Sequence, residues 1–475
     1  MDIVDLKQAC EEWIRNGRSH EAVRALERLN LTLIPRAHRR SLANLARRAD
    51  LYDLGLRILT PIMSPECDPT NYERAEYGAL LHKIGANDEA LEILCSINPD
   101  EVPEVLLFQG YCHFGQWNSE AAVAPLEVYC HHSKVTGYQR SLGQLNLLTA
   151  LVSAKLFFRA HHLIKELEPA IAGRFPRLEA SFAQIRAELA ILQDDFLEAD
   201  RQLKIAETFL NDKSSDHLFL RKWRAVMHLV RNGDSAPLRQ IAVEAADASQ
   251  WETVRSCDYQ LLKFAGTQKL FEDLYAGTPI AAYRAALVRV TGGRFQLPTV
   301  SVRGTGEQVF NLTTGEIDGE DIFARKKNLH KMLLALSADA YRPLRIGGIF
   351  LSVFPGEHFD IFSTPDRLHQ LMFRLRSVLK SAGGPVDIVE QNRFYRVVVQ
   401  SDWRMEVPLD LAAMEPAPIV KLRQIFGNKY FSTKSAADSL EMPVTTLRRV
   451  LKAALDSNLL VQDGRGPASR YKLTG

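Results

Sequence analysis

The spacing of apolar residues divides the chain into a long helical part and a shorter mixed part. Through residues 1–290, apolar positions recur every three or four residues, with turns every 12 to 18 residues. This spacing predicts amphipathic helices, and almost no strand-like alternation accompanies it. From residue 291 onward, glycine-containing turns and short alternating runs lie between helical stripes, which predicts helices mixed with small sheets. The predicted fold class is multi-domain, with an all-α region followed by two α+β domains.

A helix start with a small or apolar residue recurs at regular intervals along residues 1–290. The intervals are 34 residues from Ala22 to Leu56 and 34 from Leu56 to Ala90. They continue with 31, 39 and 39 residues, ending at Ala121, Ala160 and Ala199. A period near 34 built from two helices is typical of tetratricopeptide repeats. We therefore predict that residues 1–290 form a tetratricopeptide-like α-solenoid of six or seven degenerate helix pairs.

A solenoid of helix pairs has a concave face, which commonly holds a peptide or a protein segment. The predicted partner of this region is therefore a peptide or protein in the repeat groove. The first helix of each pair lines such a groove, which makes Tyr77, Gln109, His113 and Asn146 candidate lining residues. A spacer or a dimerisation scaffold is the alternative role for the array.

Residues 291–400 are predicted to form a hairpin, three helices and a second hairpin. The helices are expected at about 326–337, at 346–353 and from Pro365 onward, and the closing hairpin is VDIVEQNRFYRVVV. This order, with LMFRLRSVLK in the third helix and RFYRVVV at the end, resembles the effector domain of OmpR/PhoB-type bacterial regulators. Asn392 and Phe394 occupy the positions where the family usually has its wing glycines. The family's receiver domain is absent.

The resemblance implies that the third helix of this domain contacts duplex DNA. On that basis Arg367, Gln370 and Arg374 would meet base edges or phosphates, and Arg393 would lie at the wing. An arginine fork suits guanine edges and phosphates, and glutamine suits adenine. If the domain instead serves packing or dimerisation, the same basic side of the helix is simply solvated.

Residues 401–475 are predicted to contain a linker and a second DNA-binding domain. The stretch QSDWRMEVPLDLAAMEPAPI is expected to be the linker. Residues 431–473 then show a short helix, a break at Pro443, a second helix, and two strands around a glycine-bracketed loop, and this order resembles a winged helix-turn-helix. The DNA contacts that the resemblance implies are Thr445, Thr446, Arg448, Arg449 and Lys452 on the second helix, with Arg465 and Arg470 beside the wing.

Charge and composition fit this arrangement. Residues 291–475 hold 25 Lys and Arg against 19 Asp and Glu, or +6, and the remainder holds 34 against 38, or −4. A basic C-terminal part is expected of a nucleic-acid-binding end, and its modest charge predicts salt-sensitive binding that a homodimer would strengthen. The six cysteines form no CxxC pair, no apolar run is long enough to span a membrane, and no secretory signal opens the chain. We therefore expect a cytoplasmic protein without membrane contact.

No nucleotide-binding, hydrolase or metal-ligand motif occurs in the sequence. The chain is therefore predicted not to be an enzyme and to need no cofactor or metal. The sequence predicts a transcription regulator that binds double-stranded DNA through two winged helices under the control of the repeat array. The alternative is a scaffold or adaptor that uses both the repeats and the winged helices as docking surfaces for proteins.

Overall fold

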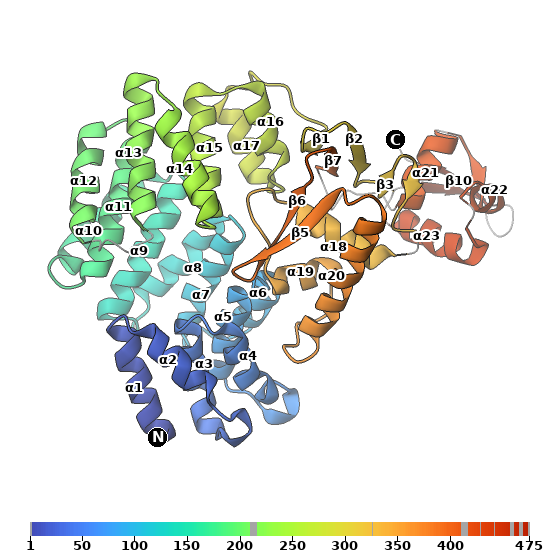
Figure 1. The fold of residues 1–475 in the computed structure, drawn as a ribbon. Helices are drawn as coiled ribbons and strands as arrows, with labels where there is room; N and C mark the ends of the chain where they lie inside the picture. The colour runs from blue at the N-terminus through green and yellow to red at the C-terminus, as the bar shows by residue number, and fades with distance from the viewer. Residues whose placement is uncertain are drawn as a thin grey trace.

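The computed structural model describes residues 2–209, 216–324, 326–409, 417–427, 429–440, 442–456, 460–464 and 469–473. Three parts follow one another along the chain: a helical region (residues 3–290), a first α+β unit (300–408) and a second α+β unit (417–473). Figure 1 shows the first unit against the helical region and the second unit on the far side of the first. The predicted order of a mostly helical part followed by helices with small sheets is confirmed.

The helical region contains seven consecutive helix pairs and three further helices among its described residues. The pairs are α1 (Ile3–Arg15) with α2 (Ser19–Glu27), α3 (Arg36–Arg48) with α4 (Tyr52–Leu59), α5 (Asn71–Lys83) with α6 (Asn87–Cys95), α7 (Glu104–Gly115) with α8 (Ser119–His131), α9 (Gly137–Ser153) with α10 (Phe157–Ile171), α11 (Pro176–Leu192) with α12 (Phe196–Thr208), and α13 (Asp216–Asn232) with α14 (Ala236–Asp247). The remaining helices are α15 (Trp251–Ala265), α16 (Gln268–Ala276) and α17 (Ala281–Val290), and short 3-10 turns cover Leu31–Leu33, Thr60–Ile62 and Pro65–Cys67. None of the described helices is long and apolar enough to cross a membrane.

Each helix pair turns through a residue with left-handed backbone geometry. These residues are Gly17, Asp50, Gly85, Trp117, Lys155, Asp194 and Gly233, with φ between 58° and 88°. A left-handed residue ends a helix because it lets the backbone N–H groups at this point bond the last carbonyl groups of that helix. These residues recur along the chain with the spacing seen in the sequence. The predicted small residues lie where two helices pack closely, since Ala22, Ala90, Ala160 and Ala199 are all fully buried. The prediction is off by one residue at Ala121, because its neighbour Ala122 is the fully buried residue.

The first α+β unit consists of a five-stranded sheet, three helices and a separate two-stranded hairpin. Its elements are β1 (Val300–Arg303), β2 (Gln308–Asn311), β3 (Glu316–Ile317), β4 (Glu320–Asp321), α18 (Lys327–Ser337), α19 (Ile346–Val353), α20 (Thr364–Ser381), β5 (Val386–Gln391), β6 (Phe394–Val399) and β7 (Trp403–Pro408). The sheet order is β1-β7-β2-β3-β4, with β7 antiparallel to β1 and parallel to β2, and β5 pairs only with β6.

The prediction of a linker after the closing hairpin is wrong for β7. This strand lies inside the sheet, and Trp403, Met405 and Val407 are buried on one of its faces. The alternation of these three apolar residues is the period of a half-buried strand. The strand's position between β1 and β2 shows that the first unit extends to residue 408.

The second α+β unit is small and has its own core. Its elements are α21 (Ala417–Phe426), β8 (Phe431–Ser432), α22 (Thr433–Ser439), α23 (Val444–Asp456), β9 (Leu460–Asp463) and β10 (Arg470–Leu473), with sheet order β8-β10-β9. Ser432 caps α22 through its hydroxyl, which accepts from the Ser435 amide at 3.1 Å. The predicted apolar stripe of α23 is buried at Leu447, Val450 and Leu451.

The first unit docks on the helical region through α19 and the loop that follows it. The Gly347 amide donates to the Ile84 carbonyl at 3.0 Å, and Arg345 Nη1 donates to the Lys83 carbonyl at 2.8 Å. In the loop, the Phe359 amide donates to Glu89 Oε2 at 2.9 Å, and its carbonyl accepts from the buried hydroxyl of Tyr77 at 3.3 Å. Tyr77, a predicted groove residue, therefore contacts the protein's own first unit.

A buried ion pair makes a second docking contact. Arg255 of α15 is fully buried, and its Nη2 lies 2.6 Å from Oδ2 of Asp339, just after α18. The Arg255 guanidinium also lies over the rings of Trp117 and Tyr341, at 4.3 and 5.4 Å from the ring centres. Trp117 comes from the turn between α7 and α8, so the pair joins distant repeats to each other and to the first unit.

Candidate nucleic-acid interface

Helix α20 presents one apolar face and one polar face. Its helical spacing predicts Leu368, Leu371, Leu375, Val378 and Leu379 on the apolar face, of which Leu371 and Val378 are only partly buried. Leu368, Met372, Leu375 and Leu379 are buried at 4 % exposure or less and recur at helical spacing. Burying a leucine side chain of this kind stabilises a fold by roughly 1.5–3 kcal/mol, which fixes the rotation of the helix. Figure 1 shows α20 on the side of the first unit that faces away from α1–α17.

The polar face of α20 carries the side chains predicted to contact DNA. Gln370 and Arg374 are exposed, and so are Ser377 and Lys380 farther along the helix. No hydrogen bond or ion pair to another described residue holds Arg374. An exposed arginine with a free guanidinium is available for a bidentate contact with a guanine edge or a phosphate.

Arg367 is also exposed but is engaged within the first unit. Its Nη1 lies 2.5 Å from Glu357 Oε2, and its guanidinium carbon lies 3.5 Å from the centre of the Phe354 ring. This contact raises the pKa of Arg367 and lowers the pKa of the Glu357 carboxyl, because each hydrogen-bonds the charged form of the other. Arg367 therefore must leave Glu357 to bind a phosphate.

Phe373 is an interface candidate that the sequence analysis missed. It lies next to Arg374 and is 75 % exposed, although phenylalanine is usually buried. Its position could have revealed its exposure from the sequence. Phe373 falls between Met372 and Leu375 of the apolar stripe but does not belong to their face of the helix. An exposed aromatic ring among basic side chains can stack on a base or pack into a protein partner.

A cleft of about 950 Å³ separates α20 from the second unit. Leu371, Arg374 and Ser377 line its α20 side, and Leu440 and Met442 line its opposite side. Beside the cleft, Lys421 Nζ of α21 lies 3.1 Å from Glu316 Oε1 of β3. The structure thus brings part of the predicted DNA surface of the first unit close to the second unit.

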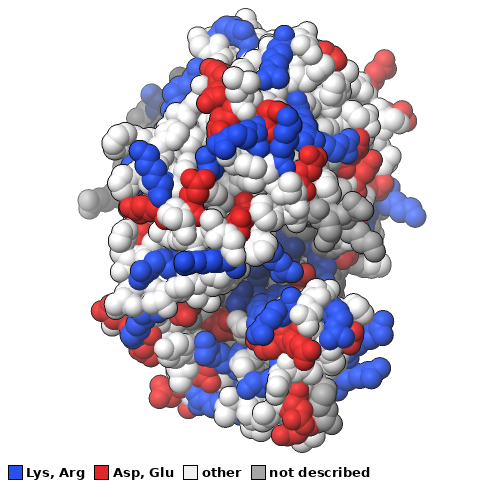
Figure 2. Space-filling model, turned by 90° about the vertical axis from the view of Figure 1, so that its left-hand side faces the viewer, with Lys and Arg blue, Asp and Glu red and all other residues white. Residues whose placement is uncertain are grey.

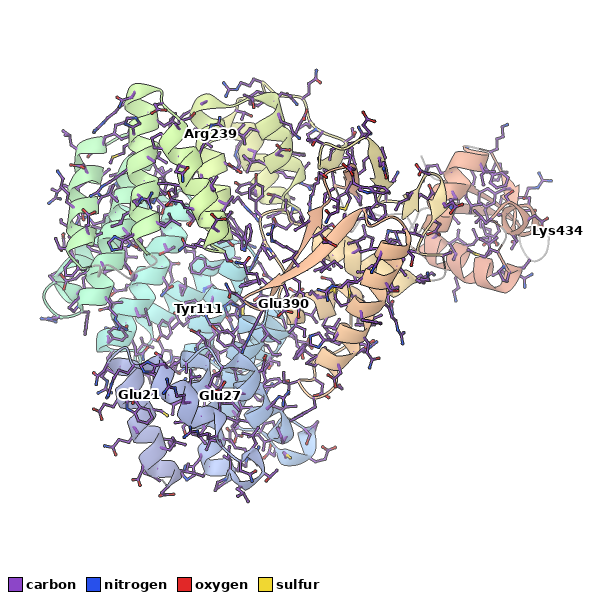
Figure 3. All side chains as sticks on the ribbon, viewed as in Figure 1. Glu21, Glu27, Tyr111, Arg239, Glu390 and Lys434 are labelled. Atoms are coloured by element: carbon purple, nitrogen blue, oxygen red, sulfur yellow. The ribbon has the colours of Figure 1, made fainter. Side chains whose placement is uncertain are left out.

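The tip of the β5–β6 hairpin points toward the helical region. Arg393, the predicted wing contact, has a left-handed backbone with φ of 65°, and its Nη1 lies 3.7 Å from Asp53 Oδ2 of α4. Figure 3 shows Glu390, near this tip, on the side of the hairpin nearest the helical region. Arg393 and α20 therefore do not share one open surface in this structure.

Three of the predicted DNA contacts of the second unit lie at its surface. Arg448 and Lys452 are exposed on α23, and Arg470 is exposed at the start of β10. Thr445, Thr446 and Arg449 belong to α23, but their side chains lie outside the described part of the structure, as does all of Arg465. Figure 3 shows Lys434 of α22 at the outer end of this unit, far from the helical region.

The helical region offers no comparable basic surface in the view of Figure 2. Basic and acidic side chains alternate over most of that face. Ion pairs of the helical region include Arg221 with Glu244 at 2.6 Å and Arg224 with Glu207 at 2.6 Å. Charges that cancel locally attract a polyanion weakly, so this face is a poorer candidate for nucleic-acid binding than the exposed sides of α20 and α23.

Comparison with known proteins does not assign the chain to a family. No protein-family model matches the chain, and no curated protein sequence resembles it significantly.

Proposed function

We propose that this protein is a sequence-specific DNA-binding transcription regulator in which α20 and α23 are the DNA-contacting helices. The carrying observation is the exposed polar face of α20, where Gln370 and Arg374 project from a helix fixed by a buried leucine stripe. The element order of both units supports winged helix-turn-helix domains, with β5–β6 and β9–β10 as wings. The helix pairs and their left-handed turns support a tetratricopeptide-like array.

The helical region is the regulatory part of this proposal. A peptide or protein partner that binds near Tyr77 and Glu89 would compete with the loop of residues 354–363 for the same groups. Such a partner binds the undocked state better than the docked state, and this difference shifts the population toward release of the first unit. The second unit lies beside α20, and a major groove is only about 12 Å wide. The second unit therefore has to move aside before α20 can enter a groove.

DNA binding is tested by fluorescence anisotropy of the full chain with a pool of duplex DNA, followed by selection of preferred sequences. Arg374→Ala and Arg448→Ala should each weaken binding by about 1–3 kcal/mol if they contact bases, or lower the salt slope by about 1 if they contact phosphates. Arg239→Ala, an exposed arginine of α14 labelled in Figure 3, is the matched control and should change neither value. Unchanged binding by the Arg374/Arg448 double variant would refute the proposal.

A protein-docking scaffold is the second candidate, favoured by one observation. Phe373 is an exposed aromatic residue in the middle of the same face, and aromatic residues dominate many protein interfaces. In that case DNA binding would be weak and nearly independent of salt, and Phe373→Ala would abolish capture of a protein partner. The salt titration of the wild-type chain distinguishes the two candidates.

A further inference from the structure

A large cleft lies between the helical region and the first α+β unit. Its volume is about 1150 Å³, slightly above the usual range for small-molecule sites, and such sites commonly lie between domains. Tyr52, Lys83 and Trp251 line it from the helical region, and Lys331, Arg342 and Phe394 line it from the first unit. Docking of the two parts therefore creates this cleft.

Basic side chains gather in the cleft without enough acidic partners. Lys83, Lys331, Arg342 and Arg345 line it, and Arg345 lies over the Phe394 ring at 4.3 Å. Burial and the neighbouring Arg47 and Arg345 lower the pKa of Lys83, and burial lowers the pKa of Arg342. Among the described residues, neither Lys83 nor Arg342 forms a side-chain hydrogen bond or close ion pair. Desolvated cations that repel one another are stabilised by an anion between them.

The acidic residues of the cleft only partly offset these charges. Asp339 is already paired with Arg255, at 2.6 Å. Burial raises the pKa of Glu252 to about 7, and its Oε1 already accepts from Trp117 Nε1 at 3.1 Å. Asp88 accepts from Gln116 Nε2 at 2.6 Å, which leaves the four basic side chains of the cleft facing three carboxyl groups, each already engaged by another residue. The cleft therefore keeps an excess of positive charge.

Four helix N-termini add to the positive potential of the cleft. The first turns or N-caps of α6, α15, α17 and α19 all contribute lining residues, among them Asn87, Gln250, Ile280 and Arg345. None of these four N-termini is capped by a side-chain hydrogen bond, although the Gly347 amide in the first turn of α19 already donates to the Ile84 carbonyl. Helix N-termini carry partial positive charge and present amide groups that favour anions.

We propose that this cleft binds a small organic anion bearing phosphate or carboxylate groups, with Lys83 and Arg342 as its anchoring charges. The aromatic walls formed by Tyr52, Trp251 and Phe394 would hold the body of the molecule. Lys83 belongs to the helical region and Arg342 to the first unit, so the bound anion links the two and stabilises their docking. This site goes beyond the DNA-binding proposal, and anion binding does not depend on that proposal.

The experiment uses the full chain with pyrophosphate and with citrate, which separate the phosphate and carboxylate sources. Binding is measured by calorimetry and by the rise in Tm, at constant ionic strength. Lys83→Met and Arg342→Met should each weaken binding at least about tenfold, since each removes a charge-assisted hydrogen bond. Lys165→Met, an exposed lysine of α10, is the control and should bind as the wild type does.

The unliganded variants give a readout that needs no probe. Lys83→Met removes a desolvated cation, so its Tm without anion should equal or exceed that of the wild type, which also shows that it folds. Saturable binding of either probe that depends on Lys83 or Arg342 supports the proposal. Absence of saturable binding with both probes, or equal loss in Lys165→Met, would overturn it. Neither outcome involves DNA, so a failure here is separate from a failure of the proposed function.

Discussion

The docking of α19 on the helical region can be tested with two adjacent glycines. An alanine Cβ at Gly347 would lie 2.8 Å from the Ile84 carbonyl oxygen and 3.0 Å from the Ala86 nitrogen. At Gly348 the nearest atom would be the Gly85 oxygen at 3.5 Å, an ordinary contact. Both residues belong to the first turn of the same short helix, so Gly348→Ala is the matched control for Gly347→Ala.

The expected effect follows from two opposing contributions. Replacing glycine by alanine in a helix stabilises that helix by up to about 1 kcal/mol, and both variants share this gain. In Gly347→Ala the new methyl group meets backbone atoms, which cannot rotate away, and such overpacking costs about 1–3 kcal/mol. Relief of this clash also moves the residue-347 amide away from the Ile84 carbonyl, which costs a hydrogen bond worth about 1 kcal/mol that Gly348→Ala keeps. Docking should therefore be weaker in Gly347→Ala than in Gly348→Ala by about 2–4 kcal/mol.

Hydrogen exchange measures this difference locally, which is preferable because a chain of several domains does not unfold in two states. Protection of peptides covering residues 84–86 and 345–353 should fall roughly 30- to 800-fold in Gly347→Ala relative to Gly348→Ala, as 2–4 kcal/mol implies. Peptides from α9 and α10 should exchange equally in both variants. Equal protection at residues 345–353 in the two variants would refute the docking geometry.

Three further predictions concern charged groups. Burial lowers the pKa of His82 from 6.5 to about 4, so the unfolded chain takes up this proton first as pH falls. Wild type should therefore lose about 2 kcal/mol more stability than His82→Gln between pH 7 and pH 5, measured by hydrogen exchange of the helix that carries the substituted residue and corrected for the intrinsic exchange rate at each pH. Arg255→Met leaves Asp339 buried without its partner and should cost about 3–5 kcal/mol, whereas Arg255→Met with Asp339→Leu should recover most of this loss in the same assay. Glu357→Gln frees Arg367 from an exposed ion pair worth at most about 1 kcal/mol, so DNA affinity should rise by up to about fivefold, and this gain should vanish in Glu357→Gln with Arg367→Ala.

Local elements of this fold are predictable from the sequence because their causes are local. Helix α19 covers Ile346–Val353, the predicted range, and α20 begins at Thr364, one residue before the predicted start at Pro365. The apolar stripes of α20 and α23 follow from helical spacing alone. The same spacing left Gln370 and Arg374 outside the stripe, and the structure places both at the surface.

Features that join distant parts of the chain were not predicted, because periodicity carries no information about them. Strand β7 pairs with β2 across the whole first unit, and its short apolar alternation was taken for a linker. The Gly347 amide meets Ile84, and Arg255 meets Asp339, only where the first unit packs against the helical region. Phe373 was missed for a different reason, because only polar residues were considered on the exposed face of its helix.

Docking on the helical region restrains the hairpin tip of the first unit, whereas the polar face of α20 lies away from the helical region and beside the second unit. The Arg393–Asp53 pair at the tip is about half exposed and 3.7 Å long, so it contributes at most about 1 kcal/mol and should open before the α19 contacts do. If the proposed function holds, release of Arg393 adds one phosphate contact to those made by α20. Asp53→Asn should therefore steepen the slope of log binding constant against log salt by about 0.9. Adding Arg393→Ala to Asp53→Asn should return the slope to its wild-type value, whereas an Asp53→Asn slope equal to the wild-type slope would show that Arg393 does not reach DNA when it is released.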